Sequence, residues 1–210
     1  MKKILLIGDS LCAGYNKQVR DTLAGKAEVL LAPESGRFAE YILRQIHDWK
    51  RELKIGGDLD LIHWNAGLWD VLRLEGDEPL TPPECYAQFI RRIALMMKKL
   101  FPNAVQIFAT STPIQEEKYS SAFSRKNADI EKYNEIARAE LEPLGVVIDD
   151  LYPVIAAMPK EWYSDVTHFY TAPATELITN AVLESVTAEL GLEPIRYEAE
   201  YKAPETVHGF

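Results

Sequence analysis

Five short apolar runs, each followed by a segment long enough for a helix, constrain the fold of this chain most strongly. None of the runs alternates with polar residues; they cover residues 4–7, 28–31, 59–64, 105–109 and 146–148. Continuous apolar runs are typical of parallel strands that are covered on both faces. The chain therefore predicts a five-stranded parallel sheet with helices on both sides, a three-layer αβα sandwich of α/β class.

The segments between the runs carry apolar residues at helical spacing. Two of these segments begin with proline, at Pro82-Pro83 and at Pro173, and proline is favoured in the first turn of a helix. Gly191 follows the last segment, where a glycine commonly ends a helix. We expect helices over residues 11–23, 38–53, 82–100, 125–141 and 173–190.

Length and charge restrict the class of protein. The 210 residues suit one domain, which we place at residues 1–192, and leave a polar tail over 193–210 that packs on the domain or on a partner. A formal net charge of −9 disfavours nucleic acid and anionic membrane surfaces as partners. The first apolar run stops at Gly8, too early for a signal peptide or a membrane span. We expect a cytoplasmic protein; a homo-oligomer stays open.

Metal and cofactor sites are not expected. The two cysteines, Cys12 and Cys85, form no CxxC pair, and the four histidines are scattered along the chain. Structural zinc sites need ligands at short spacing. The stretch over residues 8–14 also lacks the glycine patterns that bind dinucleotides or phosphates, which disfavours a flavin or nucleotide binder.

Gly8-Asp9-Ser10 places a candidate nucleophile directly after the first apolar run. In parallel sheets functional groups gather at the carboxyl ends of the strands, and a helix that begins there directs its N-terminus at a developing anion. Serine is also among the best residues for capping a helix, so Ser10 alone does not distinguish a nucleophile from a cap.

Asp165 and His168 are a candidate acid–base pair. In a helical turn, residues three positions apart share one face, and the carboxylate would orient the imidazole as in a catalytic triad. A surface contact between aspartate and histidine would have the same spacing. His63 lies inside an apolar run and is expected in the core.

Three donors could stabilise an oxyanion beside Ser10. They are the backbone N–H groups of Ser10 and Gly36 and the side-chain amide of Asn65. Glycine permits close approach to a ligand and asparagine carries two N–H donors, although both residues are also common in turns. Ser, Gly, Asn and His appear in this order, each after one of four strand positions at the same expected edge of the sheet, and this set favours acyl transfer.

These stretches together resemble the GDSL/SGNH hydrolase family. Gly8-Asp9-Ser10-Leu11 is similar to the first block of the family, Gly36 to the second, Asn65 to the third and Asp165-Val166-Thr167-His168 to the fifth. The third block usually reads Gly-x-Asn-Asp, whereas this chain has His63-Trp64-Asn65-Ala66. The resemblance implies a flavodoxin-like αβα sandwich and ester hydrolysis without a cofactor. It also implies a triad of Ser10, His168 and Asp165 and an oxyanion hole from Ser10, Gly36 and Asn65.

The substrate is less constrained. Asp9, Arg37, Trp69 and Asp70 flank the expected site and are candidate substrate-binding residues, although aromatic side chains near strand ends often pack in the core and charged ones often form surface pairs. The polar stretch over 110–127 would be a specificity loop. We expect a small acyl ester as substrate, with acetyl on a carbohydrate or small alcohol as first choice. The alternative is a non-catalytic module that binds a small ligand or glycan on the same fold.

Overall fold

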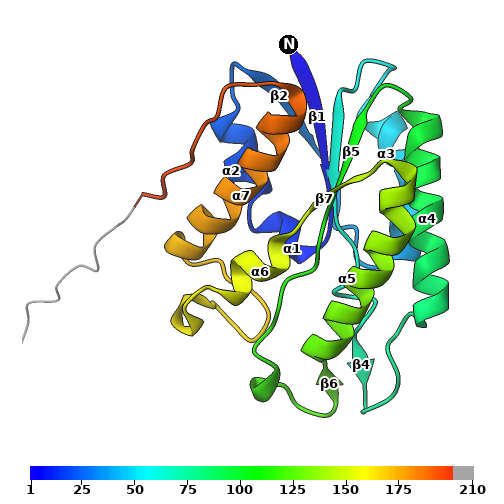
Figure 1. The fold of residues 1–210 in the computed structure, drawn as a ribbon, viewed down its shortest axis with the longest axis vertical. Helices are drawn as coiled ribbons and strands as arrows, with labels where there is room; N and C mark the ends of the chain where they lie inside the picture. The colour runs from blue at the N-terminus through cyan, green and yellow to red at the C-terminus, as the bar shows by residue number, and fades with distance from the viewer. Residues whose placement is uncertain (201–210) are drawn as a thin grey trace, which may run out of the picture.

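Residues 1–200, the part of the chain that the computed structural model describes, form a sheet between two layers of helices (Figure 1). All strands of this sheet are parallel, in the order β2-β1-β3-β5-β7. They are β1 (Lys2–Ile7), β2 (Ala27–Leu31), β3 (Leu61–Trp64), β5 (Val105–Ala109) and β7 (Val147–Asp149). The predicted sheet is confirmed, and strand ends differ from the expected ones by at most two residues.

β1 is an inner strand of the sheet. It pairs with β2 on one side and with β3 on the other, so that Ile4 lies opposite both Val29 and Leu61. Residues 4–7 are all buried. A strand covered on both faces needs an apolar residue at every position. For this reason the first polar residues of the chain after the run mark the carboxyl end of β1, where the candidate nucleophile stands.

Helices cover both faces of the sheet (Figure 1). α3, α4 and α5 pack side by side on one face, and α2 and α7 lie on the other, where α6 also contacts α7. As the helical spacing predicts, α3 buries Ile42, Ile46 and Trp49. The helices of the two layers are α2 (Asn16–Thr22), α3 (Ala39–Glu52), α4 (Pro83–Leu100), α5 (Asn127–Leu141), α6 (Leu151–Ala156) and α7 (Ala172–Leu190). The described residues also form three short 3-10 helices, which are η1 (Glu116–Lys118), η2 (Glu142–Leu144) and η3 (Lys160–Trp162).

The helix expected over residues 11–23 is broken into α1 (Ser10–Ala13) and α2. Gly14 ends α1, and a Cβ at this position would lie 2.9 Å from Cε1 of Tyr170. The next residue, Tyr15, has a φ of −131° and is fully buried. The break therefore allows the ring of Tyr170 to pack directly on the backbone and turns Tyr15 into the core.

A second, small sheet lies beyond the carboxyl ends of the main strands (Figure 1). It pairs β4 (Arg73–Leu74) with β6 (Phe123–Ser124) in antiparallel fashion. Strands of two residues have no periodicity that a sequence pattern could detect. Arg73 supports this pair by a bidentate contact with Asp129 of α5, from Nε at 2.8 Å and from Nη2 at 3.2 Å.

Residues 192–200, here called the C-terminal strap, run along α7. The side chain of Asn180 donates to the carbonyl of Tyr197 at 3.0 Å and accepts from its N–H at 2.8 Å. Further along, the N–H of Ala199 donates to Glu176 at 3.0 Å. This part of the expected tail packs on its own domain; residues 201–210 of the tail lie outside the described residues. Within residues 1–200, no helix combines the length and apolar character needed to cross a membrane.

Candidate active site

The turn from β1 into α1 presents Ser10. Asp9 is the N-cap of α1 and its Oδ1 accepts the N–H of Leu11 at 2.9 Å, so the hydroxyl of Ser10 is not used for capping. The turn requires a glycine at position 8, because a Cβ at Gly8 would lie 1.8 Å from Oδ1 of Asn65. The capping interpretation of Ser10 is therefore wrong, and its hydroxyl remains available for chemistry.

The structure brings Ser10, His168 and Asp165 into one hydrogen-bonded chain. Nε2 of His168 lies 2.8 Å from Oγ of Ser10, and Nδ1 of the same ring lies 2.8 Å from Oδ2 of Asp165. Ser10 and His168 are separated by 158 positions in the sequence. A hydroxyl, an imidazole and a carboxylate in this order are the arrangement that activates a serine for attack.

Asp165 and His168 do not meet on a helix, as their spacing had suggested, but in a tight turn. Oδ1 of Asp165 accepts the N–H groups of Thr167 and His168, each at 2.7 Å, which leaves Oδ2 directed at the imidazole. Partial burial raises the pKa of Asp165. The two backbone N–H donors and His168 outweigh this effect and hold the pKa below its ordinary value. The carboxylate is thus kept ionised, as an orienting group must be.

The stretch over residues 110–127, expected as a specificity loop, braces this turn. Gln115 holds it twice: its backbone N–H donates to the carbonyl of Val166 at 2.9 Å, and its Nε2 donates to the carbonyl of Asp165 at 3.0 Å. The hydroxyl of Tyr119 bonds to that of Thr167. These contacts fix the segment that carries the carboxylate and the imidazole.

Tyr170, one of several aromatic residues that flank the expected site, completes it in a role that the sequence did not indicate. Its ring stacks on that of His168, with centroids 4.8 Å apart and an interplanar angle of 18°. Its hydroxyl donates to the carbonyl oxygen of Ser10 at 2.7 Å. The side chain thus contacts both catalytic candidates. The only sequence signal was a position two residues after His168.

The three expected oxyanion donors differ in whether an N–H group is free to bind an oxyanion. Ser10 is the first residue of α1, where a backbone N–H has no acceptor within the helix. Nδ2 of Asn65 donates one hydrogen to Oδ1 of Asp9 at 2.9 Å and has a second one to offer. The N–H of Gly36 departs from the expectation, because it donates to the carbonyl of Gly8 at 2.7 Å and is not free for an oxyanion in this conformation.

The expected substrate-binding residues differ in their exposure to solvent. Asp9 and Asp70 are buried at 1% and 0% exposure, so neither carboxylate faces a substrate in this conformation. Both oxygens of Asp70 accept the N–H of Ala39, at 3.2 and 3.1 Å, which anchors the start of α3. Arg37 is exposed and lies over the ring of Tyr41, 4.6 Å from its centroid.

Burial governs the ionisation of these two carboxyl groups. It raises the pKa of Asp9, against the opposing hydrogen bonds from Asn65 and Leu11 and the positive charge of Arg125. It raises the pKa of Asp70 to about 7, against the hydrogen bonds from Thr81 and Ala39. Trp69, the remaining candidate, is partly exposed in the loop after β3.

Two other polar groups singled out in the sequence are internal. His63 is fully buried, as expected, and its Nε2 lies 2.9 Å from Oδ2 of Asp149. Cys12 is buried, and burial raises the pKa of its thiol to about 12. Within residues 1–200, no three His, Cys, Asp or Glu side chains converge as metal ligands.

Comparison with known proteins bears on the fold of the chain. No family model matches the sequence, and no curated protein matches it. Solved structures do match, among them a lipase/acylhydrolase from Enterococcus faecalis, with 19% identity and a TM-score of 0.68, covering 92% of this chain and 98% of that one. The acetyl xylan esterase AlAXEase has 16% identity and a TM-score of 0.70, covering 88% and 99%. A member of the lipolytic G-D-S-L family from Veillonella parvula has 16% identity and a TM-score of 0.66, covering 89% and 99%.

The shared architecture is that of the α/β acylhydrolases with a parallel five-stranded sheet. The GDSL/SGNH hydrolase fold predicted from the sequence is thereby confirmed.

Proposed function

We propose that this protein is a serine esterase that hydrolyses a short-chain acyl ester, acetyl by first choice, of a carbohydrate or small alcohol. The observation that carries the proposal is the continuous chain from Ser10 through His168 to Asp165, with 2.8 Å at each step. A module that only binds a ligand has no need of a base held against a serine hydroxyl.

The reaction proceeds in two acyl transfers. Oγ of Ser10 attacks the ester carbonyl carbon while Nε2 of His168 takes its proton, and Asp165 stabilises the imidazolium that forms. The tetrahedral intermediate collapses as Nε2 returns the proton to the leaving alkoxide, which departs as the alcohol. A water molecule then gives a proton to Nε2 and attacks the acyl-enzyme, releasing the carboxylic acid and restoring Ser10.

Negative charge on the tetrahedral oxygen is stabilised by the N–H of Ser10 and the second hydrogen of Nδ2 of Asn65. The N–H of Gly36 joins them once it leaves the carbonyl of Gly8. Removal of one such donor typically costs about 3–4 kcal/mol of transition-state stabilisation. Asn65 is therefore assigned a direct role and Asp9 the role of holding it.

The size of the space beside Ser10 supports a short acyl group. A cavity of about 270 Å³ adjoins the serine, and its lining combines small residues such as Gly8 and Ala13 with polar ones such as Asn16 and Glu34, which suit a short acyl group better than a long apolar chain. The likeness to an acetyl xylan esterase in fold supports an acetyl ester of a sugar as the first substrate to test.

Hydrolysis of p-nitrophenyl esters from acetyl to long-chain acyl tests the proposal. Wild-type protein should prefer the shortest esters, Ser10→Ala should lose turnover, and Ser185→Ala, a partly exposed serine in the second half of α7, should retain it. A fluorophosphonate probe should label Ser10 in the wild type, as located by peptide mass spectrometry. Absence of both labelling and turnover would favour the non-catalytic binding module instead.

A further inference from the structure

Arg125 lies between β6 and α5, in the stretch that braces the turn of Asp165 and His168. We infer that Arg125 is a positioning residue for acyl transfer, whose guanidinium ties the loop that carries Asn65 to the turn that carries the carboxylate and the imidazole. The inference rests on the proposed esterase function and adds to it the side chain that holds the oxyanion donor and the general base in register.

The guanidinium of Arg125 reaches the loop after β3. The residue is buried, with 5% of its surface exposed, and its Nε donates to the carbonyl oxygen of Leu68 at 2.6 Å. Leu68 lies three positions after Asn65, in a loop whose residues are buried from one to the other. The same loop is held at Ala66, whose carbonyl oxygen accepts the hydroxyl of Tyr86 at 2.9 Å. The contact from Arg125 therefore restrains the loop close to the amide that we assign to the oxyanion.

The same guanidinium reaches the turn through Tyr119. Nη1 of Arg125 donates to the hydroxyl oxygen of Tyr119 at 3.1 Å. Because a guanidinium can only donate, the hydrogen of that hydroxyl is available to Oγ1 of Thr167, to which Tyr119 is bonded. The N–H of Thr167 in turn donates to Oδ1 of Asp165 at 2.7 Å. A continuous series of hydrogen bonds thus runs from Arg125 to the carboxylate of the triad.

The two contacts of Arg125 come from different nitrogens of one planar group. Nε and Nη1 have fixed relative positions, so the carbonyl of Leu68 and the hydroxyl of Tyr119 are held relative to each other. The backbone on either side is also placed, because β6 ends at Ser124 and α5 begins at Asn127. A lysine ammonium, a single point of charge on a flexible stem, does not impose the same geometry.

The loop and the turn have to address the same carbonyl group of the substrate. Asn65 binds its oxygen while His168 takes the proton of the attacking Ser10, and a misplacement of about 1 Å can cost about 10²-fold in rate. Arg125 is also close to the residue that orients Asn65. Burial raises the pKa of Asp9, and the positive charge of Arg125 counteracts this effect. The guanidinium therefore lies where it can keep the parts of the site in their mutual positions.

Three substitutions test this role, with p-nitrophenyl acetate as substrate. Arg125→Met removes both donors and keeps an unbranched apolar stem, Arg125→Lys keeps the charge but loses the planar fork, and Tyr119→Phe removes the connecting hydroxyl. We expect kcat to fall about 10- to 100-fold in both Arg125 variants and about three- to tenfold in Tyr119→Phe, while KM changes less than about twofold. The double variant Arg125→Met/Tyr119→Phe should be no slower than Arg125→Met, because both changes break the same connection.

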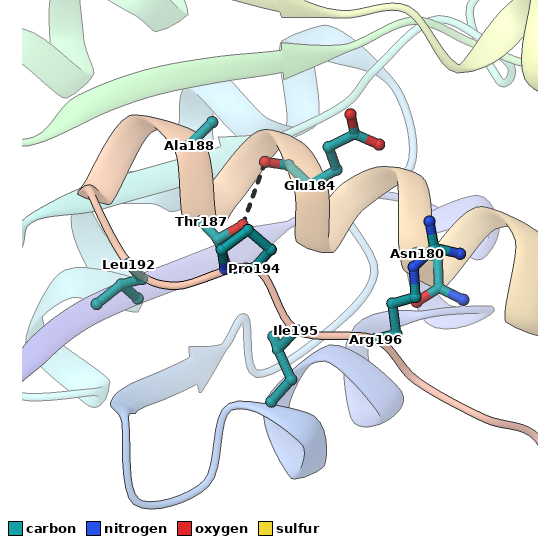
Figure 2. Close-up of a pocket in the computed structure, with 8 residues that line it drawn as sticks. All are labelled: Asn180, Glu184, Thr187, Ala188, Leu192, Pro194, Ile195 and Arg196. Atoms are coloured by element: carbon teal, nitrogen blue, oxygen red, sulfur yellow. Dashed lines mark hydrogen bonds between the residues drawn. The ribbon is translucent and has the colours of Figure 1, made fainter.

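Arg73→Met and Arg196→Met are the matched controls. Arg73 lies opposite Ser124 in the small sheet and binds Asp129, so its loss weakens the same sheet without removing a contact to the loop or the turn. Arg196 is exposed and lies beside Asn180 at the cavity of about 290 Å³ between α7 and the C-terminal strap, which no member of the triad lines (Figure 2). Its substitution removes one positive charge far from these contacts. Arg73→Met should lower Tm and Arg196→Met should not, and both should keep kcat within about twofold of the wild type.

The rate constant for labelling of Ser10 by a fluorophosphonate gives a second readout that needs no alcohol. It should fall in Arg125→Met and in Tyr119→Phe and stay unchanged in both controls. Thermal unfolding of every variant shows whether it is folded, and Tyr119→Phe keeps the test decisive if Arg125→Met is not.

Wild-type kcat in folded Arg125→Met or in Tyr119→Phe would overturn the inference. An equal loss of kcat in Arg73→Met would do so as well, because the effect would then come from the stability of the small sheet. Wild-type activity in Arg125→Lys would attribute the effect to charge and contradict the fork. A raised KM at unchanged kcat would assign Arg125 to substrate binding instead. A wild type that is neither active nor labelled at Ser10, by contrast, contradicts the esterase function itself.

Discussion

Oδ1 of Asp9 accepts two hydrogen bonds, one from Nδ2 of Asn65 and one from the N–H of Leu11, each at 2.9 Å. One buried carboxylate oxygen therefore fixes both the start of the helix that carries Ser10 and the orientation of the amide beside it. The other oxygen of Asp9 and Oδ1 of Asn65 are buried without a partner among the described residues. The orientation of Asn65 depends on this single contact.

Asp9 and Asn65 should act as one unit in catalysis. Asn65→Ala removes an oxyanion donor, and we expect kcat for p-nitrophenyl acetate to fall about 10²–10³-fold. Asp9→Asn leaves the donor in place but replaces the carboxyl group that orients it by an amide, so a loss of about tenfold or more is expected. Because the two changes affect the same contact, the double variant should be no slower than Asn65→Ala alone. Losses that multiply in the double variant would show that Asp9 acts independently of the amide.

Gly8→Ala should disable the site by steric conflict. The new Cβ would lie 1.8 Å from Oδ1 of Asn65 and 2.6 Å from Cβ of Cys12, both in packed surroundings. Overpacking of this kind costs about 1–3 kcal/mol of stability, and displacement of Asn65 adds a loss of kcat. Gly57→Ala is the control, since nothing lies within 4 Å of a Cβ there. Thermal unfolding and probe labelling of both variants measure the two effects, and a fully active, stable Gly8→Ala would contradict the packing described.

Tyr170 should position the reacting groups without taking part in bond making. Tyr170→Phe keeps the stack on His168 and loses the hydrogen bond to the carbonyl of Ser10, which predicts a fall in kcat of about three- to tenfold. Tyr170→Leu loses the stack as well and should be slower still. The rate constant of fluorophosphonate labelling should follow the same order, because it reports on the Ser10–His168 pair without requiring a particular alcohol. Equal rates in all three proteins would remove Tyr170 from the catalytic apparatus.

Asp70 should make stability depend on pH. Its pKa is about 7 in the folded protein and about 4 in an unfolded chain, so between these values only the folded state keeps the proton. The free energy of unfolding should therefore fall as pH rises from about 4 to about 7 and level off above that, by at most about 4 kcal/mol.

Asp70→Asn isolates this effect, because its carbonyl oxygen still accepts the N–H of Ala39 while its charge cannot change. Urea denaturation of both proteins between pH 5 and pH 8 gives the measurement. We expect the difference in unfolding free energy between wild type and variant to change across this range in favour of the variant as pH rises. A difference that stays constant would show that Asp70 does not titrate on folding.

The sheet could be predicted from the sequence because burial on both faces produces an uninterrupted apolar run at each strand. The place of Ser10 could be predicted for a related reason, because a polar residue directly after such a run lies at the carboxyl edge of the sheet; Asp165 and His168 reach the same edge from a segment beyond α6. Asp165 and His168 were correctly paired, although a turn closed by two backbone N–H groups brings them together and not a helix.

The remaining features depend on contacts between distant segments. The helix break at Gly14 exists because Tyr170 packs against it, and the brace from Gln115 depends on carbonyl groups 50 positions further along. The N–H of Gly36 has the residue type and place of an oxyanion donor, yet the nearby carbonyl of Gly8 takes it up. Residue types and spacing do not encode such pairings, which arise only when the segments pack.

The separation of 158 positions between Ser10 and His168 has a consequence for the protein during its own synthesis. The chain is made from its N-terminus, so the serine leaves the ribosome long before the imidazole exists. A serine hydroxyl without a neighbouring base is an ordinary weak nucleophile. Throughout most of translation the Ser10 hydroxyl of the nascent chain is thus unactivated. The acylation of Ser10 that we propose becomes possible only when nearly the whole domain has emerged and folded.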